Sequence, residues 1–323
     1  MDLHPSDDQV ALLDMIRTFA ADRFPIDIVR GFGEVGGFDR DRWSELAALG
    51  TFGIDLPESA GGTGLGFIDT VLVHEELGRA LVPGPIVAAS LAAGVVDGVL
   101  DGSVIPCVVD LDQDEVLIVE HLPSADVLLT VADDGVRCRP TSEIVAVPLR
   151  PTDPTTPIAS VRELSPGVQI GGADLAADWR RRGSLLASAQ LCGNSTGSTE
   201  LAVAYAIERE QFGRPIGSFQ GLKHLLADSW IRSEVARSSV WSAGVTLDEP
   251  EVGSIDRAVA GARITSARAA TENAKTCIQV HGGMGFTWEV DAHLFLKRAW
   301  ILETAFGSVD AAAEMMATAL TRD

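Results

Sequence analysis

Long stretches with apolar residues at helical spacing place the strongest constraint on the fold of this 323-residue chain. In the stretch from 185 to 207, small and apolar side chains recur every three or four positions, so they lie on one face of a helix that we expect to be core. The residues of this stripe are Leu185, Ala189, Cys192, Thr196, Thr199, Val203 and Ile207. Further helices are predicted over 222–247, 255–277 and about 309–320. Together these helices predict a four-helix bundle.

The first hundred residues also indicate helices. A helix is predicted over 6–24, because Ser6 can cap it with Gln9 at the capping-box position. Its core face is expected to carry Val10, Leu13, Ile16 and Ala20. A short helix around 43–49 ends at Gly50, and a longer one is expected over 67–81 after a glycine-rich loop.

The middle of the chain changes character. Short β-branched runs at 104–109, 116–119, 127–131 and near 136 are separated by Asp, Gly and Pro, as in small antiparallel sheets. Residues 150–165 are rich in Pro and Thr and are predicted to form a linker or edge loop, followed by a β-like run at 167–170. We therefore expect three domains: a helical one over 1–100, a reduced β-domain over 101–174 and a bundle over 175–323.

Composition excludes several classes of function. With 25 basic and 46 acidic residues the formal charge is −21, which opposes binding to nucleic acids or to an anionic membrane. No apolar run reaches the roughly 18 residues of a membrane span, and the start lacks the pattern of a secretory signal. Scattered cysteines without a CxxC pair indicate reduced thiols in the cytoplasm, and the six histidines form no metal motif.

A glycine-rich stretch, Gln279–Thr287, separates the helix of 255–277 from another predicted over about 290–302. Gly282, Gly283 and Gly285 are unsuited to a helix interior, where each costs about 1 kcal/mol relative to Ala. They give the backbone freedom in φ and leave it bare, so a large ligand can approach it closely. A plain turn between two helices is the alternative interpretation.

A second stretch, from Glu208 to Gln220, follows the long helix and interrupts it at Gly213 and Pro215. Taken together, ERxQFGxPIxxFQ here and QxHGGMGF in the glycine stretch resemble the acyl-CoA dehydrogenase family. LPESAGGTGLG and HEELGRALVPGP resemble the N-terminal helical domain of that family. The resemblance extends to about Ser308 and implies a mostly α fold with an N-terminal helical domain, a reduced small β-domain and a C-terminal four-helix bundle.

The resemblance also implies a reaction and a set of cofactor-binding residues. Family members remove hydrogens from the α and β carbons of an acyl-CoA thioester; a carboxylate takes the proton and FAD takes the hydride.

The resemblance places Arg209 on the FAD diphosphate, where a guanidinium fork suits the phosphates. It also places Phe212 at the flavin end, Gln220 near the adenine, and Gln279 with Gly282 and Gly283 along the ADP part. These groups would reach FAD across a dimer interface. The alternatives are a solvated helix-end charge for Arg209 and a loop cap for Gln279.

The catalytic carboxylate of the family has no counterpart. Its commonest position falls on Phe306 and its other position on Gly183, so neither can accept a proton. The TEP–GSD and GxKxWIT segments that hold the flavin ring in the family are also absent; His121–Asp126 resembles only the stretch after them. Other acidic residues near the right region are Glu289, Asp291, Glu303 and Asp310, which we interpret mainly as helix-surface groups. The Arg180–Arg182 run is either a CoA-phosphate contact or a solvated segment.

The chain therefore resembles the shorter, base-lacking subunit of the heterotetrameric α2β2 acyl-CoA dehydrogenases of actinobacterial steroid catabolism and cholesterol degradation. The resemblance implies that a longer acyl-CoA dehydrogenase subunit supplies the carboxylate, with one FAD at each heterodimer interface and electron-transfer flavoprotein as acceptor. Two alternatives stay open. One is a self-sufficient homo-oligomeric dehydrogenase with a relocated base, and the other is a flavin-free scaffold subunit.

Overall fold

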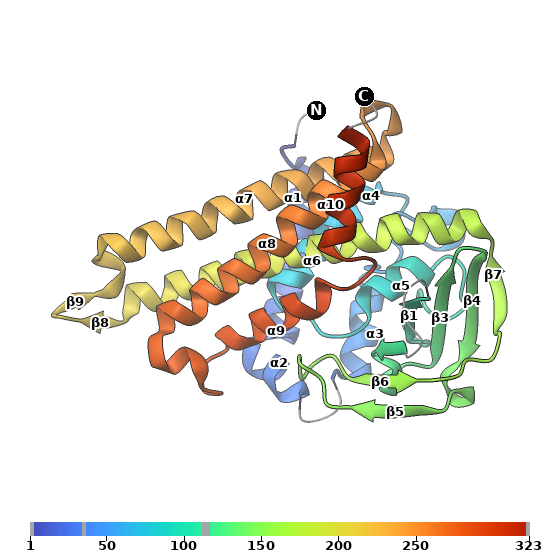
Figure 1. The fold of residues 1–323 in the computed structure, drawn as a ribbon, viewed down its shortest axis with the longest axis horizontal. Coiled ribbons are helices and arrows are strands. Elements are labelled where there is room, and N and C mark those ends of the chain that lie inside the picture. Colours follow the sequence, from blue (N-terminus) through green and yellow to red (C-terminus); the bar gives the residue numbers. More distant parts are fainter. Residues whose placement is uncertain (1–2, 34–36, 112–116, 321–323) are drawn as a thin grey trace. The chain divides into compact units, whose positions relative to one another are not determined.

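The structure is a computed structural model that describes residues 3–33, 37–111 and 117–320 (Figure 1). Contacts between residues divide it into two compact units. The first comprises Met1–Ile26, Val71–Val82 and Ser184–Asp323, and the second comprises Asp27–Thr70 and Pro83–Gly183. This grouping follows contacts rather than sequence order, and the division into 1–100, 101–174 and 175–323 stays a prediction.

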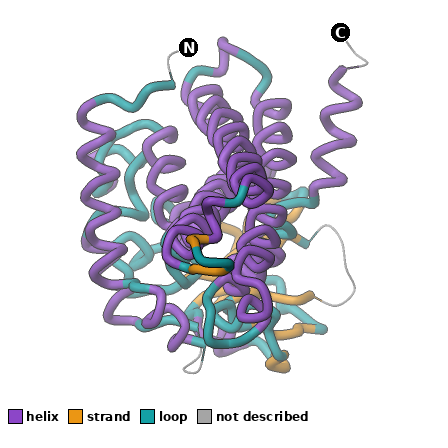
Figure 2. Tube along the Cα trace, turned by 90° about the vertical axis from the view of Figure 1, so that its left-hand side faces the viewer, coloured by secondary structure: helices purple, strands orange, loops and turns teal. Residues whose placement is uncertain are grey.

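The first unit is helical, as the periodicity predicts. Its helices are α1 (Asp7–Arg23), part of α4 (Phe67–Arg79), most of α6 (Ala173–Glu208), α7 (Gln220–Asp248), α8 (Ile255–His281), α9 (Ala292–Leu302) and α10 (Val309–Leu320). Long parts of α6, α7 and α8 run side by side (Figures 1 and 2). The mostly α fold with a helical N-terminal region, a small β region and a C-terminal helical bundle is confirmed.

The start of α1 shows how a local sequence signal fixes a helix end. The Ser6 hydroxyl accepts from the Gln9 N–H at 3.2 Å, and the Gln9 side chain accepts from the Ser6 N–H at 2.9 Å. This reciprocal pair is the predicted capping box. Leu13 and Ile16 are buried, whereas Val10 is 43% exposed, so the core face begins later than predicted.

Glycines allow α4 and α6 to cross at very short range within the first unit. A Cβ on Gly193 would lie 1.8 Å from the carbonyl oxygen of Glu75. A Cβ on Gly78 would lie 2.2 Å from the carbonyl oxygen of Gln190. No side chain fits at either position, so backbone packs directly on backbone at this crossing.

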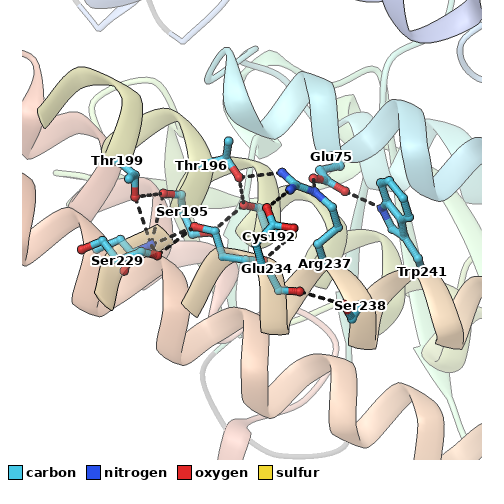
Figure 3. Close-up of polar contacts among 12 residues, drawn as sticks. Glu75, Cys192, Ser195, Thr196, Thr199, Ser229, Glu234, Arg237, Ser238 and Trp241 are labelled. Carbon is cyan, nitrogen blue, oxygen red and sulfur yellow. Dashed lines mark hydrogen bonds and ion pairs between the residues drawn. The ribbon is translucent and has the colours of Figure 1, made fainter. Parts of the chain in front are cut away.

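A buried carboxylate joins α4 to α7 beside this crossing (Figure 3). Glu75 accepts from Arg237 Nε at 2.7 Å and from Trp241 Nε1 at 2.6 Å. Arg237 also donates to Thr196 Oγ1 of α6 at 3.1 Å. Burial raises the pKa of Glu75, while the positive charge of Arg237 acts against that shift. The pair therefore links three helices through a desolvated contact.

The second unit combines short helices with small sheets. It contains most of α2 (Ile26–Phe32), with α3 (Arg40–Ala48) and α5 (Ile86–Ala92). The strands are β1 (Pro106–Asp110), β2 (Leu117–Glu120), β3 (Val127–Ala132), β4 (Gly135–Pro140), β5 (Ala146–Leu149), β6 (Ile158–Val161) and β7 (Val168–Gly171). One sheet has the order β1-β3-β4-β7 and the other has the order β2-β6-β5.

Two predictions about this β region were wrong. The sheets are not purely antiparallel, because β1 pairs with β3 in parallel while the intervening β2 belongs to the other sheet. The predicted linker of 150–165 contains β6, in which Ala159 and Val161 are buried. With only four residues, β6 is too short for its alternation to stand out. Val116, the first residue of the predicted run 116–119, lies outside the described residues.

Two further searches covered the described residues only. None of their helices is both long enough and apolar enough to span a membrane. They also contain no group of three or more His, Cys, Asp or Glu side chains arranged to hold a metal ion.

Candidate functional site

The two sequence motifs lie at one end of the helices of the first unit. Here α6 ends at Glu208, α7 begins at Gln220 and α8 ends at His281, beside the two-stranded hairpin β8 (Glu210–Gln211) and β9 (Arg214–Pro215). Figure 2 views this end from the outside. A core cluster joins the segments, and its buried members are Ala202, Ala206, Cys277, Ile278, Val280 and Ala292. Packing of small side chains therefore brings the motifs together.

The hairpin presents Phe212 to the outside. Phe212 and Gly213 have φ of 55° and 78°, and two successive positive φ values match the tight turn that joins paired strands. Positive φ is unfavourable for a bulky residue such as Phe. Phe212 is 92% exposed, and its ring meets that of Phe219 edge to face, with ring centroids 6.0 Å apart. The turn therefore holds a large aromatic ring in solvent at a strained position.

Arg209 follows directly after α6. Its N–H donates to the Tyr205 carbonyl at 2.9 Å, and its carbonyl accepts from the Ile216 N–H at 2.8 Å. The backbone is thus fixed on both sides. The side chain is exposed, and among the residues that the structure describes it has neither an ion-pair partner nor a hydrogen-bond partner. A guanidinium on a fixed backbone, with its donors free, is suited to an anion such as a diphosphate.

The glycine stretch begins inside α8 rather than after it. Gln279 and His281 belong to the last turn of α8, which corrects the predicted loop start, and Gln279 is exposed. Gly282 ends the helix with φ of 61°. A Cβ on Gly282 or Gly283 would meet no heavy atom within 4 Å, so internal packing does not explain their lack of side chains.

Gly285 differs from the two preceding glycines. A Cβ there would lie 2.4 Å from the Ile278 carbonyl oxygen, so this glycine is required by the fold itself. Gly282 and Gly283 instead leave open backbone beside Gln279, and such backbone accepts close approach of a ligand.

A stacked pair, which the sequence reasoning missed, joins the two motifs. Tyr205 and His281 have ring centroids 4.1 Å apart, and His281 Nδ1 donates to the Cys277 carbonyl at 2.8 Å. Burial raises the pKa of Cys277 to about 12, so its thiol is neutral and is no nucleophile. Tyr205 precedes Arg209 by four positions, one helical turn, and that spacing was the available signal.

Large apolar side chains surround this end without being covered by the chain. We call them the exposed apolar end: Ile207 (65% exposed), Phe212 (92%), Met284 (43%), Phe286 (83%) and Trp288 (63%). Lys297 Nζ lies 3.8 Å from the centre of the Trp288 ring. The predicted core stripe of α6 therefore fails over its last two turns, because Val203 (36% exposed) and Ile207 lie outside the core. A gathering of exposed apolar side chains is typical of an interaction surface.

Neither position that the resemblance assigns to the base carries an acidic residue. Phe306 lies between α9 and α10 with φ of 54°, and the buried Arg263 donates to the carbonyls of Ala305 (2.7 Å) and Gly307 (2.9 Å). Gly183 is buried inside α6. The turn that carries Phe306 is therefore held from both sides, but no proton acceptor occupies it.

The other acidic candidates lie at helix ends. Glu303 ends α9 and accepts from Thr271 Oγ1 at 3.4 Å, and Asp291 stands at the N-cap of α9. Glu289 and Asp310 are exposed. These positions match the interpretation as surface groups.

Two residues of the Arg180–Arg182 run, Arg180 and Arg182, form ion pairs inside the second unit. Arg180 pairs with Asp110 at 2.8 Å and with Asp133 at 2.9 Å. Arg182 pairs with Asp55, and its guanidinium lies 4.3 Å from the centre of the Phe67 ring. These ion pairs argue against a role for Arg180 and Arg182 as free phosphate ligands.

The exposed groups at the end of the first unit fit part of FAD. A free guanidinium suits a diphosphate, the side-chain amides of Gln220 and Gln279 offer donors and acceptors, and the open backbone of Gly282 and Gly283 allows close approach. They would hold the dinucleotide part of the cofactor, which when bound supplies the hydride acceptor. The resemblance implies that the segments for holding the flavin ring are absent, so these groups would form half of a site.

Comparison with known proteins agrees with the motifs. The family model "Acyl-CoA dehydrogenase, C-terminal domain" matches residues 180–321, and the model "Acyl-CoA dehydrogenase, N-terminal domain" matches residues 6–100. The chain is 35% identical to acyl-CoA dehydrogenase IpdE2 of Mycobacterium tuberculosis, over 81% of each chain. It is also 35% identical to acyl-CoA dehydrogenase FadE34 of that organism, over 91% of this chain but only 45% of FadE34.

Solved structures share the fold at lower sequence identity. The ChsE4–ChsE5 complex of M. tuberculosis contains a chain that matches with a TM-score of 0.87 and 23% identity over the whole of both chains. The Tcur3481–Tcur3483 steroid acyl-CoA dehydrogenase, as a G363A variant, matches with a TM-score of 0.84 and 23% identity over 98% of both chains. Given its identity to IpdE2 across most of both lengths, the chain belongs to the acyl-CoA dehydrogenase family.

Proposed function

We propose that this chain is the base-lacking subunit of a heteromeric, FAD-dependent acyl-CoA dehydrogenase that acts on a bulky, steroid-derived CoA thioester. It would contribute Arg209, Phe212, Gln220, Gln279, Gly282 and Gly283 to an FAD shared with a longer partner subunit. The observation that carries this proposal is the half-site itself: the Arg209 side chain, which has no polar partner among the described residues, and the uncrowded Gly282–Gly283 backbone lie on segments that the Tyr205–His281 stack joins. By the resemblance, Phe306 and Gly183 occupy the base positions of the family.

Arg209 would bind the diphosphate, and its fixed backbone would limit the entropy lost on binding. Gln279 and the Gly282–Gly283 backbone would orient the ADP part from the other side. The partner would supply the carboxylate that removes the α proton, within hydrogen-bonding reach of the substrate. Electrons would then leave through electron-transfer flavoprotein.

The exposed apolar end supports the need for a partner. Phe212 and Phe286 are 92% and 83% exposed, beside the proposed cofactor contacts. Burial of such rings at an interface provides much of the energy of association. A subunit docked here would cover the rings and place its own cofactor against Arg209.

The relatives support a two-part enzyme. The chain spans less than half of FadE34, and the remaining part of that protein has room for a second segment of similar size. Both of the structural matches described above carry the names of two polypeptides, and one is called a steroid acyl-CoA dehydrogenase. These features favour the heteromeric proposal over a self-sufficient homo-oligomer.

The direct test is Arg209→Ala in the complex formed with the proposed longer acyl-CoA dehydrogenase subunit. Loss of a charged hydrogen-bond partner should raise the dissociation constant of FAD about tenfold or more. Arg268→Ala on the exposed side of α8 is the matched control, because it removes the same charge away from the half-site. Unchanged FAD binding in Arg209→Ala would favour a flavin-free scaffold subunit instead.

The relocated-base alternative has its own test. Glu289→Gln, Asp291→Asn, Glu303→Gln and Asp310→Asn are made one at a time in the assembled enzyme. The proposal expects turnover close to wild type in each variant. Loss of turnover in one variant, with folding and FAD content retained, would establish that residue as the base.

A further inference from the structure

The interior between α6, α7 and α8 is unusually polar. The buried hydroxyl and amide side chains there are Ser195, Ser198, Thr199, Ser229, Ser233 and Asn273, none more than 2% exposed. Buried polar groups destabilise a fold unless they are hydrogen-bonded. Their contacts converge on the side chain of Asn273, which projects from α8.

Asn273 binds the backbone of both neighbouring helices. Its Nδ2 lies 2.9 Å from the Ser229 carbonyl of α7 and 3.3 Å from the Ser195 carbonyl of α6. Helical carbonyls recur every 1.5 Å along the axis, and a hydrogen bond tolerates only a few tenths of an ångström. These contacts therefore define both the axial offset and the rotation of three helices.

Side chains complete the set around the same amide. Nδ2 also lies 2.9 Å from Ser233 Oγ and 3.1 Å from Thr199 Oγ1, and Oδ1 accepts from Arg232 Nε at 2.8 Å. Figure 3 shows Ser195 and Thr199 of α6 close to Ser229 of α7. Both polar ends of the Asn273 amide are thus occupied. We call Asn273 and these hydrogen-bond partners the hub.

The rest of the α8 interface offers little to fix an offset. Its buried residues are mostly small: Ala260, Ala262, Ser266, Ala267, Ala269, Ala270, Ala274 and Cys277. Small side chains form shallow ridges that interlock weakly, whereas a single buried Asn is known to fix helix register. Asn273 therefore fixes the helix register, a role that larger interlocking side chains have at other helix interfaces.

The three helices lead to the proposed cofactor contacts. At a rise of 1.5 Å per residue, Gln279 is about 9 Å along α8 from Asn273. Gln220 is about 14 Å along α7 from Ser229, and Arg209 is about 15 Å beyond Thr199 at the end of α6. An offset of one residue at the hub would therefore displace one cofactor contact relative to the other two.

We propose that Asn273 is a positioning residue of the half-site. It sets the register of α6, α7 and α8, so that Arg209, Gln220 and Gln279 lie at the spacing of one bound dinucleotide. This inference rests on the proposed function and assigns to a buried residue, remote from the cofactor, control over how tightly FAD is held.

The test uses Asn273→Leu in the complex with the longer subunit, because Leu has the same branching and number of side-chain heavy atoms as Asn, although it is bulkier, and removes every hydrogen bond that Asn273 makes. A misplacement of about 1 Å should raise the dissociation constant of FAD about tenfold. The thermal midpoint should also fall, because the buried partners of Asn273, Arg232 Nε among them, are left without it and because Leu is larger than Asn. Ala262→Gly, another buried position on α8, is the control for simple destabilisation and should leave FAD affinity within about twofold.

The outcomes separate the two proposals. FAD affinity within twofold of wild type in Asn273→Leu, alongside weakened binding in Arg209→Ala, overturns the role of Asn273 alone. Unchanged binding in both variants overturns the half-site as well. If Asn273→Leu fails to assemble, the double variant Thr199→Val with Ser233→Ala removes two acceptors of the hub. Its FAD affinity should fall about threefold, and no change there overturns the inference.

Discussion

Tyr205 and His281 stack with ring centroids 4.1 Å apart and an interplanar angle of 27°. Tyr205 precedes Arg209 by one helical turn, and His281 follows Gln279 by two positions. The ring of His281 is held in turn by its hydrogen bond to the Cys277 carbonyl. The stack is thus a direct link between the two motifs that carry the proposed cofactor contacts.

Replacing Tyr205 should weaken FAD binding in the assembled protein. Aromatic stacking contributes about 0.5–1.5 kcal/mol beyond burial, so Tyr205→Ala should raise the FAD dissociation constant about three- to tenfold. Tyr205→Phe keeps the ring and should remain close to wild type. Flavin fluorescence titration measures both. Equal affinity in the two variants would show that the stack has no part in holding the motifs.

The Glu75–Arg237 pair predicts a large and asymmetric effect on stability. Arg237→Ala would leave the buried Glu75 carboxylate without its cation and should lower the unfolding free energy by about 3–5 kcal/mol. The double variant Glu75→Gln with Arg237→Met removes both charges and should lose clearly less, since the amide oxygen introduced in place of the carboxylate can still accept from Trp241. Urea unfolding measures the free energy of unfolding of the single and the double variant. A double variant as unstable as the single one would contradict the desolvation argument.

The helix crossing at Gly193 should not tolerate a side chain. Gly193→Ala would push a methyl group into the backbone of Glu75 and should destabilise the protein by about 3 kcal/mol or prevent folding. Gly221→Ala is the matched control, because a Cβ at this position of α7 would meet nothing within 4 Å. That substitution should stabilise by about 0.5–1 kcal/mol. Thermal melts that rank the two variants the other way would disprove the close crossing.

Asp126 should make the stability of the second unit depend on acid pH. Partial burial acts to raise the pKa of this carboxyl, but hydrogen bonds from Arg40 and the Ile105 N–H and the charge of Arg40 outweigh it, so the pKa lies below 3.8. A lowered folded-state pKa means that the stabilisation is present above pH 3.8 and is lost as the pH falls through the folded value.

Asp126→Asn is the variant that measures this contribution. Its thermal midpoint should lie below that of wild type by a constant margin from about pH 5 to about pH 8. The margin should shrink as the pH drops below about 3.8, where the unfolded chain begins to bind a proton at Asp126 that the folded protein binds only at lower pH. A margin that stays the same down to about pH 3 would mean that the charge on Asp126 contributes nothing.

The sequence predicts the helices well because their signals are local. The Ser6–Gln9 capping box and the three- to four-residue spacing along α6, α7 and α8 depend on a single segment each. Those features require no knowledge of distant neighbours.

The sequence-based predictions are wrong where contacts between residues distant in sequence determine the structure. The parallel pairing of β1 with β3 depends on which sheet β2 joins, and the short β6 is stabilised by strands on both sides rather than by its own composition. Ile207 continues the apolar stripe of α6 yet is exposed, because the stripe extends beyond the part of the helix that other elements cover. The contacts of Tyr205 with His281 and of Asn273 with α6 and α7 join helices that are distant in sequence, so periodicity on one helix cannot reveal them.

The most direct measurement is the flavin content and mass of the purified chain, alone and co-expressed with the proposed longer acyl-CoA dehydrogenase subunit. The account predicts a colourless protein alone and a yellow α2β2 assembly with one FAD per heterodimer. A yellow protein from this chain alone, with one FAD per chain, would contradict the shared half-site and place a complete flavin pocket within this subunit.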